Sequence, residues 1–164
     1  MSLSNHPCWV TAMHEASHIA VFLKLGGQWG ASGKSIRIQP FAGAVELGGL
    51  SDYKYGYFLD YCVYAAGVAA DRIQGVYSCV TRGSDMHALR DLAIDYKLTT
   101  TDIDMVITGI EKWLRKHNKI IEFAAEQLII ASDIRGNVPR TRSNKIVKVM
   151  IEKIPRRREL VKRR

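Results

Sequence analysis

The residues with the clearest capacity for chemistry form an H-E-x-x-H pattern near the start of the chain: His14, Glu15 and His18. They lie in an apolar run, Val10 to Leu25, that favours a helix. Residues four positions apart share a helix face, so both imidazoles can reach one metal ion. Glu15 lies one position round from that face, within reach of water at the metal. The pattern predicts metal-assisted hydrolysis, with His14 and His18 as ligands and Glu15 as catalytic base.

The alternative is that both histidines simply belong to a core-facing stripe of the same helix. Buried histidines and a buried glutamate cost free energy unless they have partners. A metal ion would remove that cost, so we favour the metal site. The stripe in question contains Val10, His14, Ser17, His18, Val21 and Leu25.

A catalytic zinc usually has three protein ligands, and the pattern supplies two. The metzincin extension H-E-x-x-H-x-x-G-x-x-H is ruled out by Val21 and Lys24. Asp85 falls on the apolar stripe of a helix expected over 84–97, so it is a candidate for the third ligand. It could instead only stabilise the N-terminus of that helix. The stripe is formed by Leu89, Leu92, Ala93 and Tyr96.

Asp71 is the rival candidate, because it follows a run of small residues centred on Gly67. It could ligate the metal, or accept the second ring N–H of a ligating histidine. It could also form only a surface ion pair, for instance with Arg72.

The distribution of apolar, glycine and proline residues predicts a mainly α fold with a small β-sheet of two or three strands. The H-E-x-x-H helix is zincin-like, and the C-terminal part is helical. Thr100 or Thr101 is expected to cap the helical segment 99–132, and Asn118 to break it. The expected helices are 7–25, 57–75, 84–97 (capped by Ser84), 99–132 as one or two, and 142–154. The expected strands are 35–39 and 44–47, with a turn from Pro40 to Gly43 and a loop at 136–141.

Length and charge indicate one domain, residues 1–154, followed by a basic tail, residues 155–164. The tail has six basic residues against one glutamate, a net charge of +5 out of +8 for the chain. Such a tail could contact nucleic acid, an anionic membrane or an acidic partner weakly, or remain a solvated terminus.

The chain has no run of 18 apolar residues, so we expect no transmembrane segment, and its first residues do not resemble a signal peptide. Its three cysteines, Cys8, Cys62 and Cys79, are odd in number and widely spaced. They predict neither a disulfide framework nor a cysteine zinc site, and they favour the reducing cytoplasm.

Three ordered blocks within about residues 9–97 resemble the peptidase domain of the FtsH family, the M41 zinc metallopeptidases. The first is His14-Glu15-Ala16-Ser17-His18, where Ser17 replaces the family's glycine. The second is the small-residue helix Ala65 to Gly75, where Asp71 is shorter than the usual glutamate and Arg72 replaces a second acid. The third is the segment from Thr81 to Met86, which contains Asp85.

This resemblance implies a Zn²⁺ ion held by His14, His18 and Asp85, with Glu15 as general base and Asp71 in a supporting role. It also implies a strand beside the site whose edge pairs with an extended substrate. That strand would comprise Ala44, Val45, Glu46 and Leu47. The family's ATP-driven module and membrane segments do not fit into this chain, so we expect substrates to be unfolded or flexible.

The favoured prediction is therefore a zinc endopeptidase acting on polypeptide substrates without intrinsic ATPase activity. One alternative is a metal-stabilised, non-catalytic protein that uses its basic tail to bind nucleic acid or acidic partners. Another is a dedicated regulatory peptidase that cuts a single partner protein. The sequence leaves the oligomeric state open.

Overall fold

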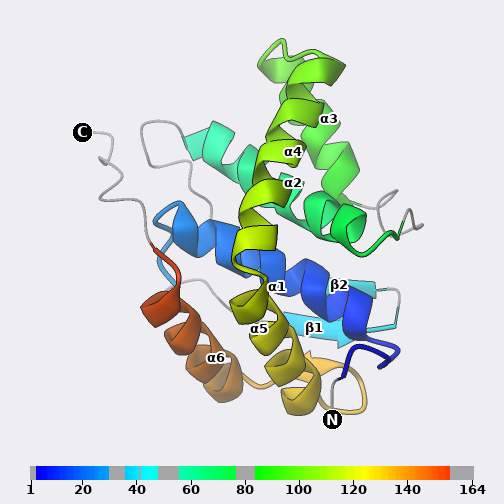
Figure 1. The fold of residues 1–164 in the computed structure, drawn as a ribbon, viewed down its shortest axis with the longest axis vertical. Coiled ribbons are helices and arrows are strands. Elements are labelled where there is room, and N and C mark those ends of the chain that lie inside the picture. Colours follow the sequence, from blue (N-terminus) through cyan, green and yellow to red (C-terminus); the bar gives the residue numbers. More distant parts are fainter. Residues whose placement is uncertain (1–2, 30–35, 41, 48–55, 77–83, 156–164) are drawn as a thin grey trace.

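A computed structural model describes residues 3–29, 36–40, 42–47, 56–76 and 84–155. Within these ranges the fold is mainly helical with a small three-stranded antiparallel sheet, as the sequence predicted (Figure 1). Its elements in chain order are α1 (Trp9–Lys24), β1 (Ile36–Gln39), β2 (Ala42–Val45), α2 (Gly56–Ile73), α3 (Ser84–Asp95), α4 (Thr100–Lys116), α5 (Asn118–Ala131), β3 (Asn137–Val138) and α6 (Arg140–Lys153).

Helix α1 is the centre of the molecule, and every residue from Thr11 to Leu23 is buried. It packs against α2, α5 and the sheet, so it is covered on all sides (Figure 1). Apart from five buried polar residues, its buried side chains are apolar, as expected of a helix in the core rather than at a surface. Gly26, at φ +94°, ends it, with the Gly26 and Gly27 N–H groups donating to the carbonyls of Leu23 and Phe22.

The sheet has the strand order β2-β1-β3. Strand β3 lies in the segment 136–141, where we expected only a loop, so that expectation was wrong. Asn137 pairs with Arg37 and Val138 with Ile36. A strand of two residues is too short to show an alternating pattern, so it could not be predicted from the sequence.

Strand β2 begins and ends two residues earlier than predicted. Gln39 pairs with Ala42 across a two-residue connection, so the strand starts before Gly43 rather than after it. Ala44 and Val45 are in the strand, whereas Glu46 and Leu47 follow its end, contrary to the prediction.

The helical boundaries were predicted to within a few residues, with corrections at the caps. Ser84 is the first residue of α3 rather than its cap, and Tyr96 lies beyond the helix with 41% of its surface exposed. Thr99 caps α4, because it exchanges reciprocal hydrogen bonds with Asp102. The long helical segment is broken at His117, one residue before the predicted position.

No helix in the described ranges combines the length and the apolar character needed to cross a lipid bilayer. Several predicted features fall outside the described residues. They are Ser35, Cys79, the Thr81-Arg82-Gly83 segment and residues 156–164 of the basic tail.

Candidate metal centre

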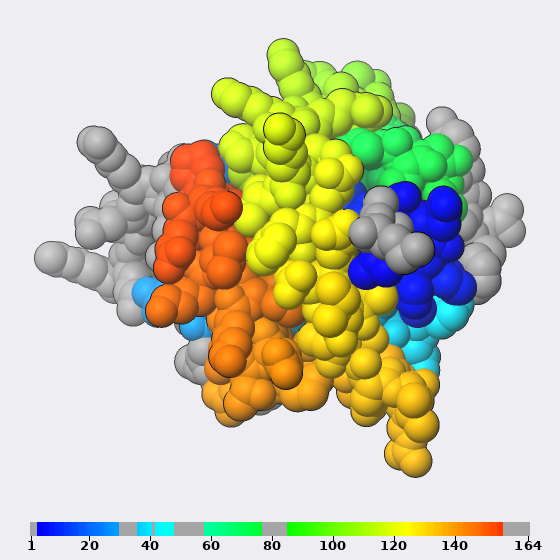
Figure 2. All heavy atoms as spheres, turned by 60° about the horizontal axis from the view of Figure 1, so that its bottom comes forward, coloured from blue at the N-terminus to red at the C-terminus, as the bar shows by residue number. Residues whose placement is uncertain are grey.

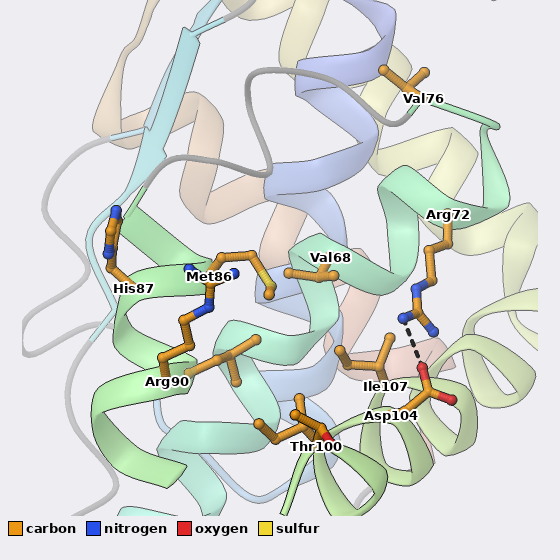
Figure 3. A pocket seen from close by; sticks show the side chains of 11 residues that line it. Val68, Arg72, Val76, Met86, His87, Arg90, Thr100, Asp104 and Ile107 are labelled. Atoms are coloured by element: carbon orange, nitrogen blue, oxygen red, sulfur yellow. Dashed lines mark hydrogen bonds and ion pairs between the residues drawn. The ribbon is translucent and has the colours of Figure 1, made fainter. Parts of the chain in front are cut away.

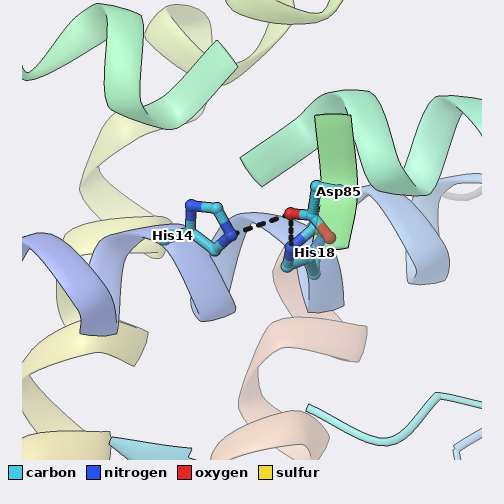
Figure 4. Close-up of side chains that lie close together, drawn as sticks. All are labelled: His14, His18 and Asp85. Carbon is cyan, nitrogen blue, oxygen red and sulfur yellow. Dashed lines mark hydrogen bonds and ion pairs between the residues drawn. The ribbon is translucent and has the colours of Figure 1, made fainter. Parts of the chain in front are cut away.

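The two histidines of α1 and one carboxylate of α3 meet at a single point (Figure 4). The Nε2 atoms of His14 and His18 each lie 2.9 Å from the same oxygen, Oδ2 of Asp85. The ligand atoms of the three residues all fall within 4.8 Å of one another. Zinc binds nitrogen and oxygen ligands at about 2.0–2.2 Å, so one ion could contact all three. These are the three residues that the sequence analysis proposed as metal ligands.

Hydrogen bonds at the opposite ring nitrogens orient both imidazoles. His18 Nδ1 donates to the carbonyl oxygen of Val63 at 2.8 Å, and His14 Nδ1 lies 3.1 Å from Oδ1 of Asp71. A carbonyl oxygen or an ionised carboxylate can only accept, so the proton is held on Nδ1 in each ring. The lone pair of a neutral imidazole is then on Nε2, directed at the cluster, as a metal ligand requires.

Asp71 stands behind His14 rather than among the candidate ligands. It is fully buried, so the surface ion pair considered from the sequence is wrong. Its Oδ1 faces the ring nitrogen of His14 that points away from Asp85. Its Oδ2 is buried without a hydrogen-bond partner in the described part of the chain. This position suits support of a ligand, and Asp71 is absent from the clustered group.

Gly67 of α2 forms the wall of the cluster opposite α1. A β-carbon at this position would lie 2.5 Å from His14 Nε2 and 2.7 Å from Asp85 Oδ2. Such distances are well inside van der Waals contact, so any side chain here would displace the candidate ligands. The small residues around Gly67 therefore let α2 approach α1 at the point where the cluster forms.

The side chains of the cluster favour a proton on His14, held between the carboxylates of Asp71 and Asp85. Burial opposes charge on His14, but hydrogen bonds with Asp71 and Asp85 outweigh it and raise the pKa of His14 to about 10. Burial likewise opposes charge on Asp85, yet its hydrogen bonds with His14 and His18 hold its pKa well below the usual range. A divalent cation could take over the role of that proton between the same donors.

Glu15 is buried, and it contacts the sheet as well as lying beside the two histidines in α1. A β-carbon on Gly43 of β2 would lie 2.6 Å from Glu15 Oε1 and even closer to Thr11 Cγ2. Burial raises the pKa of the Glu15 carboxyl, although the nearby His18 and His14 oppose this. Strand β2 thus crosses α1 directly at the candidate base, and its other edge pairs with no strand among the described residues.

Ser17, which stands between the histidines, keeps the helix closely packed. It is buried, and its hydroxyl donates to the carbonyl of Met13 at 2.8 Å. Its polar group is therefore satisfied within α1 and takes no part in the cluster.

A separate cavity of about 660 Å³ lies between α2, α3 and α4 (Figure 3). Its walls are largely apolar, and at its rim Arg72 and Asp104 form an ion pair of 2.7 Å. None of the three clustered residues lines it. It is therefore distinct from the candidate metal centre, although Met86 in its wall directly follows Asp85 in the chain.

Sequence reasoning missed two contributors to the site. The Val63 carbonyl that orients His18 is a backbone group, which has no sequence signature. Gly43 was assigned to a turn because glycine after proline is typical of one. Its role could have been predicted from a different signal. A glycine within a segment otherwise suited to a strand often marks a point where another part of the chain approaches the backbone closely.

Comparison of the chain with protein-family models, curated proteins and solved structures gives no significant match.

Proposed function

We propose that this chain is a zinc-dependent endopeptidase that hydrolyses unfolded or flexible polypeptide segments in a reaction that needs no ATP. The observation that carries the proposal is the convergence of three ligand atoms beside a buried glutamate. His14 Nε2 and His18 Nε2 both meet Asp85 Oδ2 at 2.9 Å, and Glu15 lies between the histidines in α1.

The donor set supports zinc in particular. Two imidazoles and one carboxylate are ligands typical of catalytic zinc, and three protein ligands leave a coordination position open. Bound zinc would polarise the scissile carbonyl and lower the pKa of a water molecule to about 7. The resemblance of these residues to the FtsH-family peptidase domain agrees with the same assignment.

The residues of the chain would divide the remaining work. Glu15 accepts a proton from the attacking water and delivers it to the departing amine. Asp71 and the Val63 carbonyl fix the orientation of the two imidazoles through their Nδ1 atoms. Gly67 leaves the space in which the ligands meet.

One edge of β2 pairs with no strand in the described part of the chain, and it offers a place for the substrate. An extended polypeptide can add to a sheet edge through backbone hydrogen bonds, largely independently of its sequence. Because Gly43 packs on Glu15, a segment paired with β2 would run next to the base. Only an unfolded or flexible segment can adopt that extended form. The odd number of cysteines leads us to assign the enzyme to the cytoplasm.

The proposal is tested by measuring zinc per purified chain and cleavage of an unfolded protein such as reduced casein, with and without a chelator. We expect one zinc ion per chain, cleavage that the chelator abolishes, and recovery when zinc is restored. Asp85→Ala should lose both zinc affinity and cleavage.

Asp91→Ala is the matched control, because Asp91 is an exposed carboxylate on the same helix. It should retain both zinc and activity. Full zinc occupancy without cleavage of any unfolded protein or peptide would overturn the endopeptidase assignment. Unchanged zinc affinity in Asp85→Ala would overturn the ligand assignment alone.

A further inference from the structure

A groove of about 320 Å³ runs between α5 and α6, on the face shown in Figure 2 where the two helices lie side by side. Its walls are mainly aliphatic and aromatic. Phe123 and Ile130 come from α5, and Ile146 and Val149 from α6. Ile130 keeps 67% of its surface exposed and Phe123 keeps 36%, so the apolar walls are open to solvent.

The rim of this groove is basic on the α6 side. Arg142 and Lys145 line it, and no carboxylate in the described part of the chain forms an ion pair with either. Helix α6 as a whole carries five basic residues and one glutamate, a net charge of +4 over 14 residues. An exposed apolar groove beside unneutralised cations indicates an interaction surface rather than a solvated face.

We propose that this groove binds an acidic, amphipathic helical segment of a partner protein. The apolar side of such a segment would cover Phe123, Ile130 and Val149, and its carboxylates would pair with Arg142 and Lys145. Two neighbouring helices with a trough between them offer the same geometry to a third helix as they do in a bundle.

The chemistry of the groove favours this occupant over others. The chain's own C-terminal residues 156–164 are themselves basic, so they have the same sign as the rim. Nucleic acid would leave the aliphatic walls unused, because phosphates and sugars gain nothing from isoleucine and valine. A flat membrane surface would not fill a concave groove. This inference is independent of the proposed peptidase function.

The test uses the full chain carrying Glu15→Gln, so that the probe is not cut even if the peptidase proposal is right. The probe is a fluorescein-labelled peptide of 14 residues, the length of α5 and α6, with leucines at i, i+3, i+4 and i+7 and glutamates elsewhere. Its binding is followed by fluorescence anisotropy at physiological salt. Arg142→Glu with Lys145→Glu should weaken binding at least about tenfold.

Lys112→Glu with Lys116→Glu is the matched control, since it makes the same charge change at exposed positions of α4. It should change binding by no more than about twofold at this ionic strength. Ile130→Ser, which alters no charge at an exposed position, should also weaken binding.

Three results would overturn the proposal. One is equal weakening by the two charge-reversed pairs, which would indicate attraction by net charge alone. Another is equally tight binding of a peptide with serines in place of the leucines. The third is that another ligand binds this groove more tightly than the peptide and displaces the probe from it. The two ligands tested are single-stranded DNA of about 20 nucleotides and phosphatidylserine vesicles.

Discussion

Gly67 of α2 and His14 of α1 approach so closely that a β-carbon on the glycine would lie 2.5 Å from the imidazole Nε2. The contact joins two helices that are neighbours in the core, and it falls on the atom proposed to bind zinc. A single methyl group at this position therefore tests whether the cluster is a functional site.

Gly67→Ala should lower zinc affinity by about ten- to a hundredfold, because the added methyl group displaces His14 and Asp85 from their meeting point. Gly109→Ala is the control: it lies within α4, and an added β-carbon there meets nothing within 4 Å. It should stabilise the fold by about 0.5–1 kcal/mol through helix propensity alone. Competition with a fluorescent zinc chelator measures the affinities. Equal affinity in the two variants would contradict the close approach.

Asp71→Ala should weaken zinc binding by about ten- to a hundredfold, since it removes the acceptor that fixes His14 Nδ1–H. Asp71→Asn should lie between this variant and the native protein, because its amide oxygen can still accept. Asp104→Ala breaks the exposed ion pair with Arg72 and should cost at most about 1 kcal/mol of stability, without affecting zinc. Isothermal titration calorimetry with zinc separates the three. If Asp71→Ala bound zinc as tightly as Asp104→Ala, the supporting role of Asp71 would be wrong.

Gly43→Ala should reduce cleavage while leaving zinc content intact. The added methyl group would press on Glu15 and Thr11, not on the histidines, so the base and the neighbouring strand would shift. Zinc per chain and the rate of casein cleavage, measured on the same preparation, provide the two readouts. Loss of zinc together with activity would mean that the strand supports the metal cluster rather than the base.

The stabilisation gained from zinc should increase as the pH rises from about 6 to about 9. In the metal-free protein, Asp71 and Asp85 overcome burial and raise the pKa of His14 from 6.5 to about 10. The resulting stabilisation is fully present below pH 6.5 and is lost as the pH rises through about 10. Zinc binds only the unprotonated ring. The proton on His14 therefore opposes zinc binding most strongly at low pH.

Thermal unfolding with zinc and with chelator, at several pH values, gives the difference directly. His14→Ala should abolish the alkaline loss of stability in the chelated protein. A zinc effect that shrinks with rising pH would argue that His14 is not a ligand.

How far the sequence could predict this molecule depended on whether each signal was local. The spacing of His14 and His18 is local to one helix, so their shared face was predictable. The position of Asp85 depends on how α3 packs against α2, which brings its carboxylate to His14, 71 residues away along the chain. Its place on the apolar stripe fitted a metal ligand and a charge that stabilises the helix N-terminus equally well. Only the motif resemblance favoured Asp85 as a ligand.

The elements that sequence reasoning misplaced were those fixed by tertiary contacts. Strand β3 exists because Asn137 and Val138 meet β1, and two residues have no pattern of their own. The cap of α4 was assigned one or two residues late, because three successive threonines offer the same hydroxyl and only Thr99 is paired with Asp102. Glu46 and Leu47 were assigned to β2 because the turn was expected to extend from Pro40 to Gly43. The hairpin connection has only two residues, so the strand begins and ends earlier.

The measurement that tests the central claim most directly is a paired assay of zinc content and cleavage rate in Glu15→Gln. This substitution keeps the shape of the side chain and removes its capacity to accept a proton. We predict one zinc ion per chain, as in the native protein, with casein cleavage slowed by about 10²- to 10⁴-fold. Cleavage at the native rate in a zinc-loaded Glu15→Gln protein would contradict the account.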